Sequence, residues 1–265
     1  MKIAIFGAGV MGRALATGLR NNGAAVDVFF GTRTEESASA VTTETGFSAS
    51  ADPGTVVANA DIVVFCLKPH KVLGVFDAIG SAMPSSAIAV SIAAGMSLSK
   101  LALHLPEGQP LIRAMPNTPC KIGAGMTVLS GASTATAAHL QTVEQIFSAF
   151  GEVLCLDEEH MDAVTGLSAS GPAFIFLVIE ALTDGGVMAG LPRDVALKLA
   201  TAATKGAACL VQESGEHPAQ LRDAVTTPAG CTISALLRLE DGKLRSVLAR
   251  GVQEAAESAA KLGKD

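Results

Sequence analysis

"IAIFGAGVMGRALATGL", residues 3–19, is the stretch that decides the fold of the first part of this 265-residue chain. A short apolar run, Ile3 to Phe6, meets Gly7, Gly9 and Gly12, and a segment rich in alanine and leucine follows at once. Such a strand-to-helix junction is either a tight structural turn or a cradle for a phosphate. The residues around the junction have to separate these two interpretations.

In dinucleotide-binding folds each glycine of G-x-G-x-x-G has its own physical role. The first permits a tight turn, the second lets a pyrophosphate approach the backbone, and the third lets helix and strand pack closely. The helix N-terminus then offers unpaired N–H groups and a partial positive charge to the phosphates. A strand before, a helix after and a continuing βαβ rhythm favour dinucleotide binding here. The residues expected at the cofactor are Gly7, Ala8, Gly9, Val10, Met11 and Gly12.

Apolar runs alternate with helix-like stretches up to about residue 157. Strands are expected over residues 2–6, 25–30, 61–67, 87–93, 110–115, 126–130 and 152–156. Helices are expected over residues 11–21, 34–45, 53–58, 70–79, 97–103 and 134–150. This alternation predicts an α/β Rossmann-type domain, with a parallel sheet and crossover helices.

The pattern changes near Asp157, and no convincing strand follows. Helices are expected over residues 161–167, 173–189, 195–213, 218–225, 233–239 and 244–262. Gly171-Pro172 is expected to interrupt or kink the first of them, because proline removes a backbone donor. We therefore expect two domains, a dinucleotide-binding Rossmann-type domain over residues 1–157 and an all-helical domain over residues 158–265.

The second domain is unusually apolar. "AFIFLVIEALTDGGVMAGL", residues 173–191, has one acid, Glu180, among its first ten residues. A helix that is apolar around most of its circumference must be buried on several sides, and a small domain has few such sites. The sequence therefore predicts an obligate homodimer through residues 160–265.

Composition argues against several classes of function. The net charge is −6 and the chain has neither Trp nor Tyr, so nucleic acid is not an expected partner. The five cysteines are odd in number and form no C-x-x-C pair, and the histidines are scattered, so no metal site is expected. The same cysteine pattern favours a protein of the reducing cytoplasm. No signal peptide is evident, and no unbroken apolar stretch long enough to span a bilayer is found, so no membrane partner is expected.

The choice of dinucleotide is expected to depend on the end of the second strand, where NAD-specific folds place an acid for the ribose 2′-hydroxyl. Asp27 lies too early, inside the strand, and "GTRTEE" follows the strand at residues 31–36. The hydroxyl of Thr32 and the guanidinium of Arg33 suit a 2′-phosphate instead. NADPH is therefore the expected cofactor, with NADH as a second substrate; a merely exposed surface arginine is the alternative.

Three common catalytic arrangements do not fit. A Tyr-x-x-x-Lys pair is impossible without tyrosine, and "GLSASGP" lacks the final glycine of a G-x-S-x-G elbow, because Ser170 stands there. The β-hydroxyacid dehydrogenases share the expected layout, but their catalytic lysine would fall at Ile175.

Five segments together resemble the Δ1-pyrroline-5-carboxylate reductases. They are "SIAAG" (91–95), "RAMPNTP" (113–119), "GLSASGPAF" (166–174), "DGGVMAGLPR" (184–193) and "ESGEHPAQLRDAVTTPAGCT" (213–232). The resemblance covers nearly the whole chain. It implies reduction of the cyclic imine pyrroline-5-carboxylate to L-proline with NADPH or NADH. It also implies homodimers or rings of dimers, with the substrate beside a helical interface.

The resemblance assigns roles to further residues. Thr232 would direct its hydroxyl at the ring nitrogen, although a position just before a helix also makes it a candidate N-cap. Substrate binding would involve Thr227, Gly230, Cys231 and Thr232, with backbone amides holding the carboxylate. Leu67, Lys68, Pro69, Ala93, Ala94 and Asn117 would contact the cofactor, and Met115, Asn117 and Thr118 would line a cleft between domains.

Three positions depart from the family pattern. Ala229 replaces a glycine and is tolerable only at negative φ, Cys231 stands where Thr or Ala is frequent, and Ala169 replaces a glycine. Two other functions remain open: another NADPH-dependent imine or carbonyl reductase of this architecture, and a non-catalytic NADP sensor.

Overall fold

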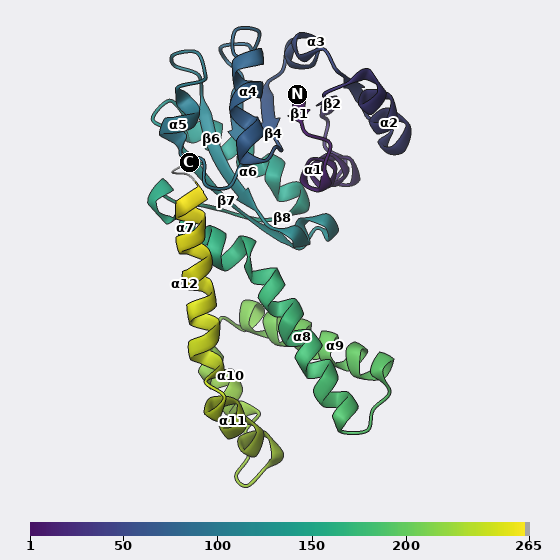
Figure 1. Cartoon of the computed structure of the whole chain (residues 1–265), viewed down its shortest axis with the longest axis vertical. Helices are drawn as coiled ribbons and strands as arrows, with labels where there is room; N and C mark the ends of the chain where they lie inside the picture. The colour runs from purple at the N-terminus through teal and green to yellow at the C-terminus, as the bar shows by residue number, and fades with distance from the viewer. Residues whose placement is uncertain (263–265) are drawn as a thin grey trace. The chain divides into compact units, whose positions relative to one another are not determined.

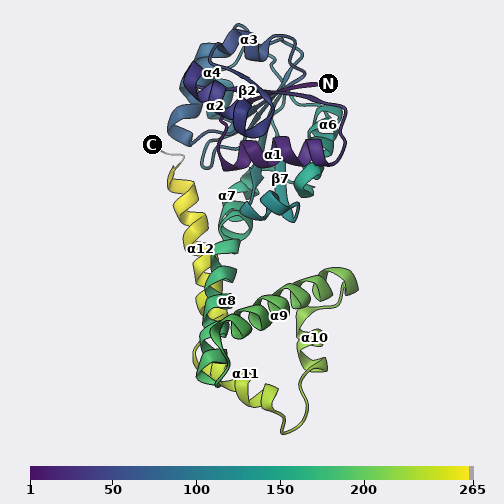
Figure 2. The same cartoon turned by 90° about the vertical axis from the view of Figure 1, so that its right-hand side faces the viewer.

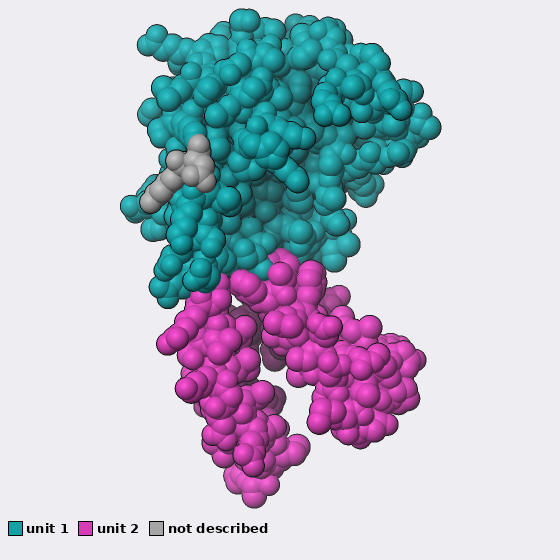
Figure 3. Space-filling model, in the orientation of Figure 1, with its two compact units in different colours: residues 1–170, 253–265 teal, residues 171–252 magenta. Residues whose placement is uncertain are grey.

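The computed structural model describes residues 1–262. It divides into two compact units, residues 1–170 with 253–262, and residues 171–252 (Figure 3). The first unit thus includes the beginning of the expected helical domain, and the domain boundary at residue 157 stays a prediction.

Within residues 1–262 the strands form one sheet in the order β3-β2-β1-β4-β5-β6-β7-β8 (Figure 1). They are β1 (Lys2–Phe6), β2 (Asp27–Gly31), β3 (Ser48–Ser50), β4 (Ile62–Phe65), β5 (Ile88–Ser91), β6 (Leu111–Pro116), β7 (Gly125–Gly131) and β8 (Gly151–Cys155). Strands β1 to β6 are parallel and follow the order typical of a Rossmann fold. The predicted α/β architecture is confirmed.

Two details of the sheet were not predicted. Strand β3 is a short run of Ser48, Ala49 and Ser50 beside β2, and small polar residues give no strand pattern. Strand β7 is antiparallel to β6, with Ala114 opposite Leu129, so the sheet is mixed rather than wholly parallel. The connection between β6 and β7 is a short 3-10 helix, Thr118–Ile122, which is too short for a parallel crossover.

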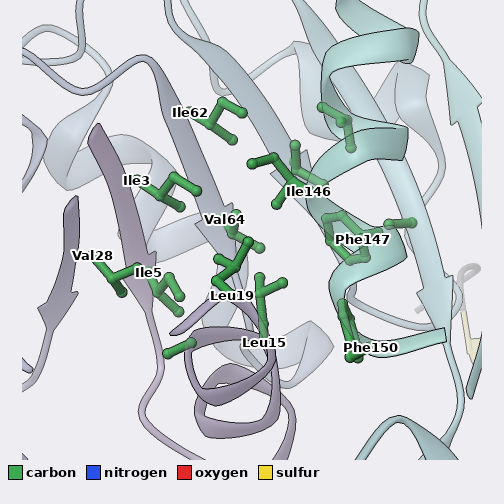
Figure 4. Close-up of a cluster of buried hydrophobic side chains, with 14 of the residues drawn as sticks. Ile3, Ile5, Leu15, Leu19, Val28, Ile62, Val64, Ile146, Phe147 and Phe150 are labelled. Atoms are coloured by element: carbon green, nitrogen blue, oxygen red, sulfur yellow. The ribbon is translucent and has the colours of Figure 1, made fainter. Parts of the chain in front are cut away.

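Helices cover both faces of the sheet. They are α1 (Val10–Asn21), α2 (Glu35–Thr45), α3 (Pro53–Val57), α4 (Pro69–Ile79), α5 (Leu98–Ala102) and α6 (Ala137–Phe147). One buried cluster joins the sheet to α1 and α6, and Figure 4 shows Leu15 and Leu19 facing Ile5 and Val64. A second cluster joins the opposite face to α3, α4 and α5. The glycine loop therefore lies at the end of a rigid three-layer core.

The ends of the helices follow from local chemistry. Helix α1 buries Gly12, Leu15, Ala16 and Leu19, the spacing of one helical face. The hydroxyl of Thr34 accepts the Ser37 N–H at the start of α2, as expected for an N-cap.

The sheet also buries one positive charge, on Arg113 of β6. Its Nη1 lies 3.4 Å from Glu158 Oε1, and its Nη2 lies 3.9 Å from Asp162 Oδ1. Glu158 also accepts the N–H of Leu98 at 2.6 Å. The segment that leads into the helical part of the chain is thus held to the sheet by a buried arginine that forms ion pairs with two acids of this segment, while its Nε and Nη2 have no hydrogen-bond partner.

No strand follows Cys155 in the part of the chain that the structure describes, as predicted. The later helices are α7 (Met161–Val164), α8 (Gly171–Met188), α9 (Arg193–Ser214), α10 (Pro218–Ala224), α11 (Cys231–Asp241) and α12 (Leu244–Leu262). In Figure 2 α9 crosses α8, and α10 and α11 follow as separate short helices.

The predicted interruption at Gly171-Pro172 takes the form of a widened turn. Residues Thr165–Ala169 are π-helical, and the Ser170 N–H donates to the Thr165 carbonyl, five residues back, at 3.0 Å. Pro172 is the second residue of α8, a position in the first helical turn where a missing N–H costs little. The wider turn shifts the hydrogen-bonding pattern at this point, and the helical run continues into α8.

The helical run Glu158–Met188 is therefore longer than predicted. By length and composition it could cross a membrane, and its most apolar part is almost entirely unburied. The run has no unbroken apolar stretch of this length, since Ser168, Ser170 and Glu180 interrupt it, but the helix continues through Pro172. Phe176 and Leu177 are 63% and 66% exposed. Apolar surface of this extent requires a covering surface.

Candidate active site

The glycine loop has the geometry that a dinucleotide requires. Gly7 has a φ of +107°, and a Cβ there would collide with the Cys66 carbonyl oxygen of the loop after β4. A Cβ on Gly12 would collide with the Gly7 carbonyl oxygen, whereas nothing lies within 4 Å of a Cβ on Gly9. Gly7 and Gly12 are therefore needed for packing, and Gly9 leaves open space for an approaching phosphate.

The loop lies at the topological switch point of the sheet. Strand β1 pairs with β2 on one side and with β4 on the other, and the chain leaves β1 and β4 at the same edge. Ligands of open parallel sheets bind at this place. Leu67 is half-buried there, Lys68 is exposed, and Pro69 begins α4. The structure thus brings the glycine loop and the Leu67–Pro69 loop together, and their contact with a cofactor stays a prediction.

The end of β2 carries a free cation and no acid. Arg33 is exposed and has no hydrogen-bond or ion-pair partner among residues 1–262. Asp27 begins β2 opposite Lys2, so about four residues, or roughly 13 Å, separate it from the ligand edge. Thr32 donates its hydroxyl to the Thr34 carbonyl at 3.0 Å, so it holds the loop. Arg33 is the better placed of the two residues predicted to contact a 2′-phosphate.

The loop after β5 presents less side chain than predicted. Ala93 is 1% exposed, with its methyl in the core, while Ala94 is half-buried. Met115 was expected to line a cleft, but it is 4% exposed and packs with Val128 and Met161. That expectation is wrong because β6 is covered by the chain's own α7. Thr118 is exposed and begins the 3-10 helix after β6.

Asn117 is already committed to hydrogen bonds. Its Nδ2 donates to the Ser168 carbonyl at 3.2 Å, and its Oδ1 accepts the Met126 N–H at 3.0 Å. The side chain therefore joins the end of β6 to the π-helical turn before α8. A contact with the cofactor would use the remaining hydrogen-bonding capacity of this amide.

The second group of predicted residues lies at the start of α11. Helix α11 begins at Cys231, and its N-cap is Gly230, which has no side chain to cap it. Thr232 is the second helical residue, so it is not the N-cap, and no partner for its hydroxyl is found among residues 1–262. The first N–H groups of α11 and this hydroxyl are available to an anionic ligand with a polar ring atom.

A tight turn presents this helix start. The Gly230 N–H donates to the Thr227 carbonyl at 3.0 Å across Pro228 and Ala229. Proline followed by a residue of positive φ is typical of a type II turn. Ala229 has a φ of +56°, so the expectation of a negative φ is wrong. The turn demands this conformation, and the alanine adopts it at a cost in strain.

Two contacts near the predicted site were not expected from the sequence, one of the Arg13 side chain with the Ala8 carbonyl and one of the Ser168 carbonyl with Asn117. Arg13 is the fourth residue of α1, at the end of its first turn, where the helix dipole disfavours a positive charge. Ser168 contributes its backbone carbonyl, and a backbone group that every residue has cannot be identified from the sequence pattern. No group of three or more His, Cys, Asp or Glu side chains that could hold a metal ion is found in residues 1–262.

Two family models match the chain. The model described as pyrroline-5-carboxylate reductase dimerisation matches residues 158–262. The model described as NADP oxidoreductase coenzyme F420-dependent matches residues 2–95. The first match covers the exposed apolar helices, and the second covers the glycine loop.

Known proteins resemble the chain over nearly its whole length. The pyrroline-5-carboxylate reductase of Corynebacterium melassecola is 36% identical over an alignment of 266 positions, which covers 99% of this chain and 98% of that protein. The enzyme of Escherichia coli K12 is 36% identical over 265 residues, with coverages of 99% and 98%.

Solved structures agree in fold. The Coxiella burnetii pyrroline-5-carboxylate reductase has a TM-score of 0.92 at 30% identity, over 99% of this chain and 98% of that one. The Plasmodium falciparum pyrroline carboxylate reductase, crystallised with NADP bound, has a TM-score of 0.89 at 28% identity, with coverages of 99% and 98%. The likeness spans both units, the glycine loop and the start of α11, and the chain belongs to the pyrroline-5-carboxylate reductase family.

Proposed function

We propose that this protein reduces L-1-pyrroline-5-carboxylate to L-proline with NADPH, the last step of proline biosynthesis. The observation that carries the proposal is the start of α11, which has uncapped backbone amides and an unpartnered Thr232 hydroxyl. A family member that retains both this helix start and the glycine loop has the groups that imine reduction needs. The glycine loop belongs to the first compact unit and the start of α11 to the second.

The cofactor's site belongs to the first unit. Bound NADPH supplies the hydride, and the chain has to hold the dinucleotide and choose between its two forms. The N–H groups of Gly9, Val10 and Met11 at the start of α1 suit the diphosphate. Arg33, free and exposed after β2, suits a 2′-phosphate, so NADPH is the expected cofactor and NADH a weaker one.

The substrate's site belongs to the second unit. The amides of Cys231 and Thr232 form a seat for the substrate carboxylate at a helix N-terminus. The Gly230 amide, also expected there, instead donates to the Thr227 carbonyl and holds the turn. The Thr232 hydroxyl then reaches the ring nitrogen, polarises the C=N bond and helps a proton arrive as the carbon accepts hydride. No covalent nucleophile and no metal is required of the protein.

The protein is further proposed to act as a homodimer in the cytoplasm, either alone or within a ring of dimers. The exposed apolar faces of α8 and α9 support this assembly, because a second copy would cover them without any membrane. Light scattering at micromolar protein concentration tests it. A stable monomer there would contradict the proposal.

The activity is tested by following the oxidation of NADPH with racemic pyrroline-5-carboxylate, with NADH in a parallel assay. Formation of proline in equal amount to the NADPH consumed is the expected result. A panel of other cyclic imines and carbonyl compounds separates this enzyme from another reductase of the same architecture. Tight NADPH binding without turnover of any of them would identify a sensor instead.

A further inference from the structure

Arg13 joins the glycine loop to a neighbouring helix. From α1 its Nε donates to the Ala8 carbonyl at 2.7 Å, and its Nη1 pairs with Glu44 Oε2 at 2.5 Å. Glu44 lies in the last turn of α2, the helix that follows the predicted 2′-phosphate contact. One side chain therefore links the predicted diphosphate loop to the C-terminal end of α2.

The bond to Ala8 has a consequence for Gly9. In a planar trans peptide the C=O and the following N–H point in opposite directions. When Arg13 holds the Ala8 carbonyl, it also fixes the direction of the Gly9 N–H. Gly9 is the position at which the backbone has open space on its Cβ side. The Gly9 N–H is thus set in one direction before any phosphate arrives.

Stability alone does not explain the presence of an arginine here. A cation near a helix N-terminus is disfavoured by the helix dipole. The Arg13 and Glu44 side chains are 39% and 55% exposed, and an ion pair between such exposed groups stabilises a protein little. The short hydrogen bond from Arg13 Nε to the Ala8 carbonyl is therefore the contact that best explains an arginine at this position.

We propose that Arg13 is a positioning residue for dinucleotide binding: it holds the Ala8–Gly9 peptide so that the Gly9 N–H faces the diphosphate. Its effect is the same for NADPH and NADH, because the two share the diphosphate. The inference rests on the proposed function only in requiring a dinucleotide cofactor. It separates affinity, set partly by Arg13, from the choice of cofactor, assigned to Arg33.

Two substitutions separate positioning from charge. In Arg13→Gln, Nε2 lies the same number of bonds from Cα as the arginine Nε, so the donor to Ala8 is kept and the charge is lost. Arg13→Met has a similar length and has neither a donor nor a charge. Positioning predicts that Gln retains binding and Met does not. A direct ion pair between Arg13 and a phosphate predicts that both lose it.

Arg20 offers a matched control. It lies two helical turns after Arg13 on the same face of α1, and its Nη1 donates to the Thr45 carbonyl at the end of α2, at 2.8 Å. Arg20→Met therefore loosens the same pair of helices without touching the loop. Any effect common to Arg13→Met and Arg20→Met reflects the packing of α1 on α2.

The experiment is calorimetric titration of NADPH and of NADH into the wild-type protein and the three variants, with thermal unfolding to verify folding. Arg13→Met should weaken both cofactors by a similar factor of about three to ten, the range for one hydrogen bond. Arg13→Gln and Arg20→Met should stay within about twofold of wild type, a difference below one hydrogen bond. At saturating cofactor, kcat should be unchanged in all three.

Several outcomes would overturn the inference. They are unchanged binding in Arg13→Met, a loss confined to NADPH, or equal losses in the Gln and Met variants. If Arg13→Met does not fold, Arg13→Ala, which also lacks a donor, replaces it, and wild-type binding in that variant would overturn the inference. Wild-type protein that binds both cofactors but reduces no imine would contradict the proposed function and leave the role of Arg13 standing.

Discussion

The side-chain amide of Asn117 donates to the Ser168 carbonyl at 3.2 Å. In a regular helix this carbonyl would accept the N–H of the residue four positions later. That residue is Pro172, which has no N–H. A residue after β6 thus supplies the donor that the proline withholds, and it does so beside a π-helical turn.

Replacing Asn117 with Ala should lower the free energy of unfolding by about 1–3 kcal/mol, because the Ser168 carbonyl and the Met126 N–H both lose a partner. In a Pro172→Ala background the cost should be smaller, since the helix then offers its own donor to Ser168. Urea denaturation of the four proteins at one protein concentration measures this coupling. Strictly additive costs would mean that the two residues act independently.

Ala229 adopts a φ of +56° in the turn before α11. Glycine has no Cβ and takes this conformation without strain, so Ala229→Gly should raise the free energy of unfolding by about 1 kcal/mol. Thermal unfolding at fixed protein concentration measures the change. The matched control is Ala224→Gly in α10, where glycine should destabilise by up to about 1 kcal/mol. A destabilising Ala229→Gly would contradict the assigned turn.

Thr232→Ala should lower kcat by about ten- to a thousandfold, because one polarising hydroxyl is lost at the imine nitrogen. Thr232→Ser keeps the hydroxyl and should recover most of the rate. The Michaelis constant for NADPH should not change in either variant, since the cofactor's predicted contacts lie in the other unit. Steady-state kinetics decide, and wild-type turnover in Thr232→Ala would show that the hydroxyl is structural.

Arg33→Ala should raise the Michaelis constant for NADPH by about ten- to a hundredfold, through loss of a charge-assisted contact of roughly 1.5–3 kcal/mol. The constant for NADH should hardly move, because NADH has no 2′-phosphate. Initial rates with each cofactor make the comparison. Equal effects on the two cofactors would remove this assignment.

The thiols should differ in reactivity toward iodoacetamide. Burial raises the pKa of Cys66 to about 12, so this thiol stays protonated up to well above neutral pH and should not react. Cys231 is exposed in the proposed carboxylate seat, and its alkylation should abolish activity. Cys231→Ala should resist the reagent, and proline should protect the wild type. Full activity of protein alkylated at Cys231 would contradict the seat.

Much of this protein was predictable because the deciding interactions are local. The turn at Gly7, the packing at Gly12 and the apolar strands follow from backbone sterics and from burial of the sheet on both faces. The order of strands and helices could therefore be derived, as could the free cation after β2. The short strand β3 could not, because Ser48–Ser50 pairs with β2 through its backbone and has no apolar pattern.

The sequence by itself determined a dinucleotide-binding sheet followed by apolar helices, since residue spacing sets which face of each element is buried. Only the tertiary structure decided which polar groups meet: Arg13 with the Ala8 carbonyl, Asn117 with the Ser168 carbonyl, and Ala229 in a left-handed turn. Two of these contacts end on backbone carbonyls, which every residue has, and the third is a dihedral angle. Such features depend on the position of the backbone in the folded chain, and for that reason they cannot be predicted from the pattern of side chains.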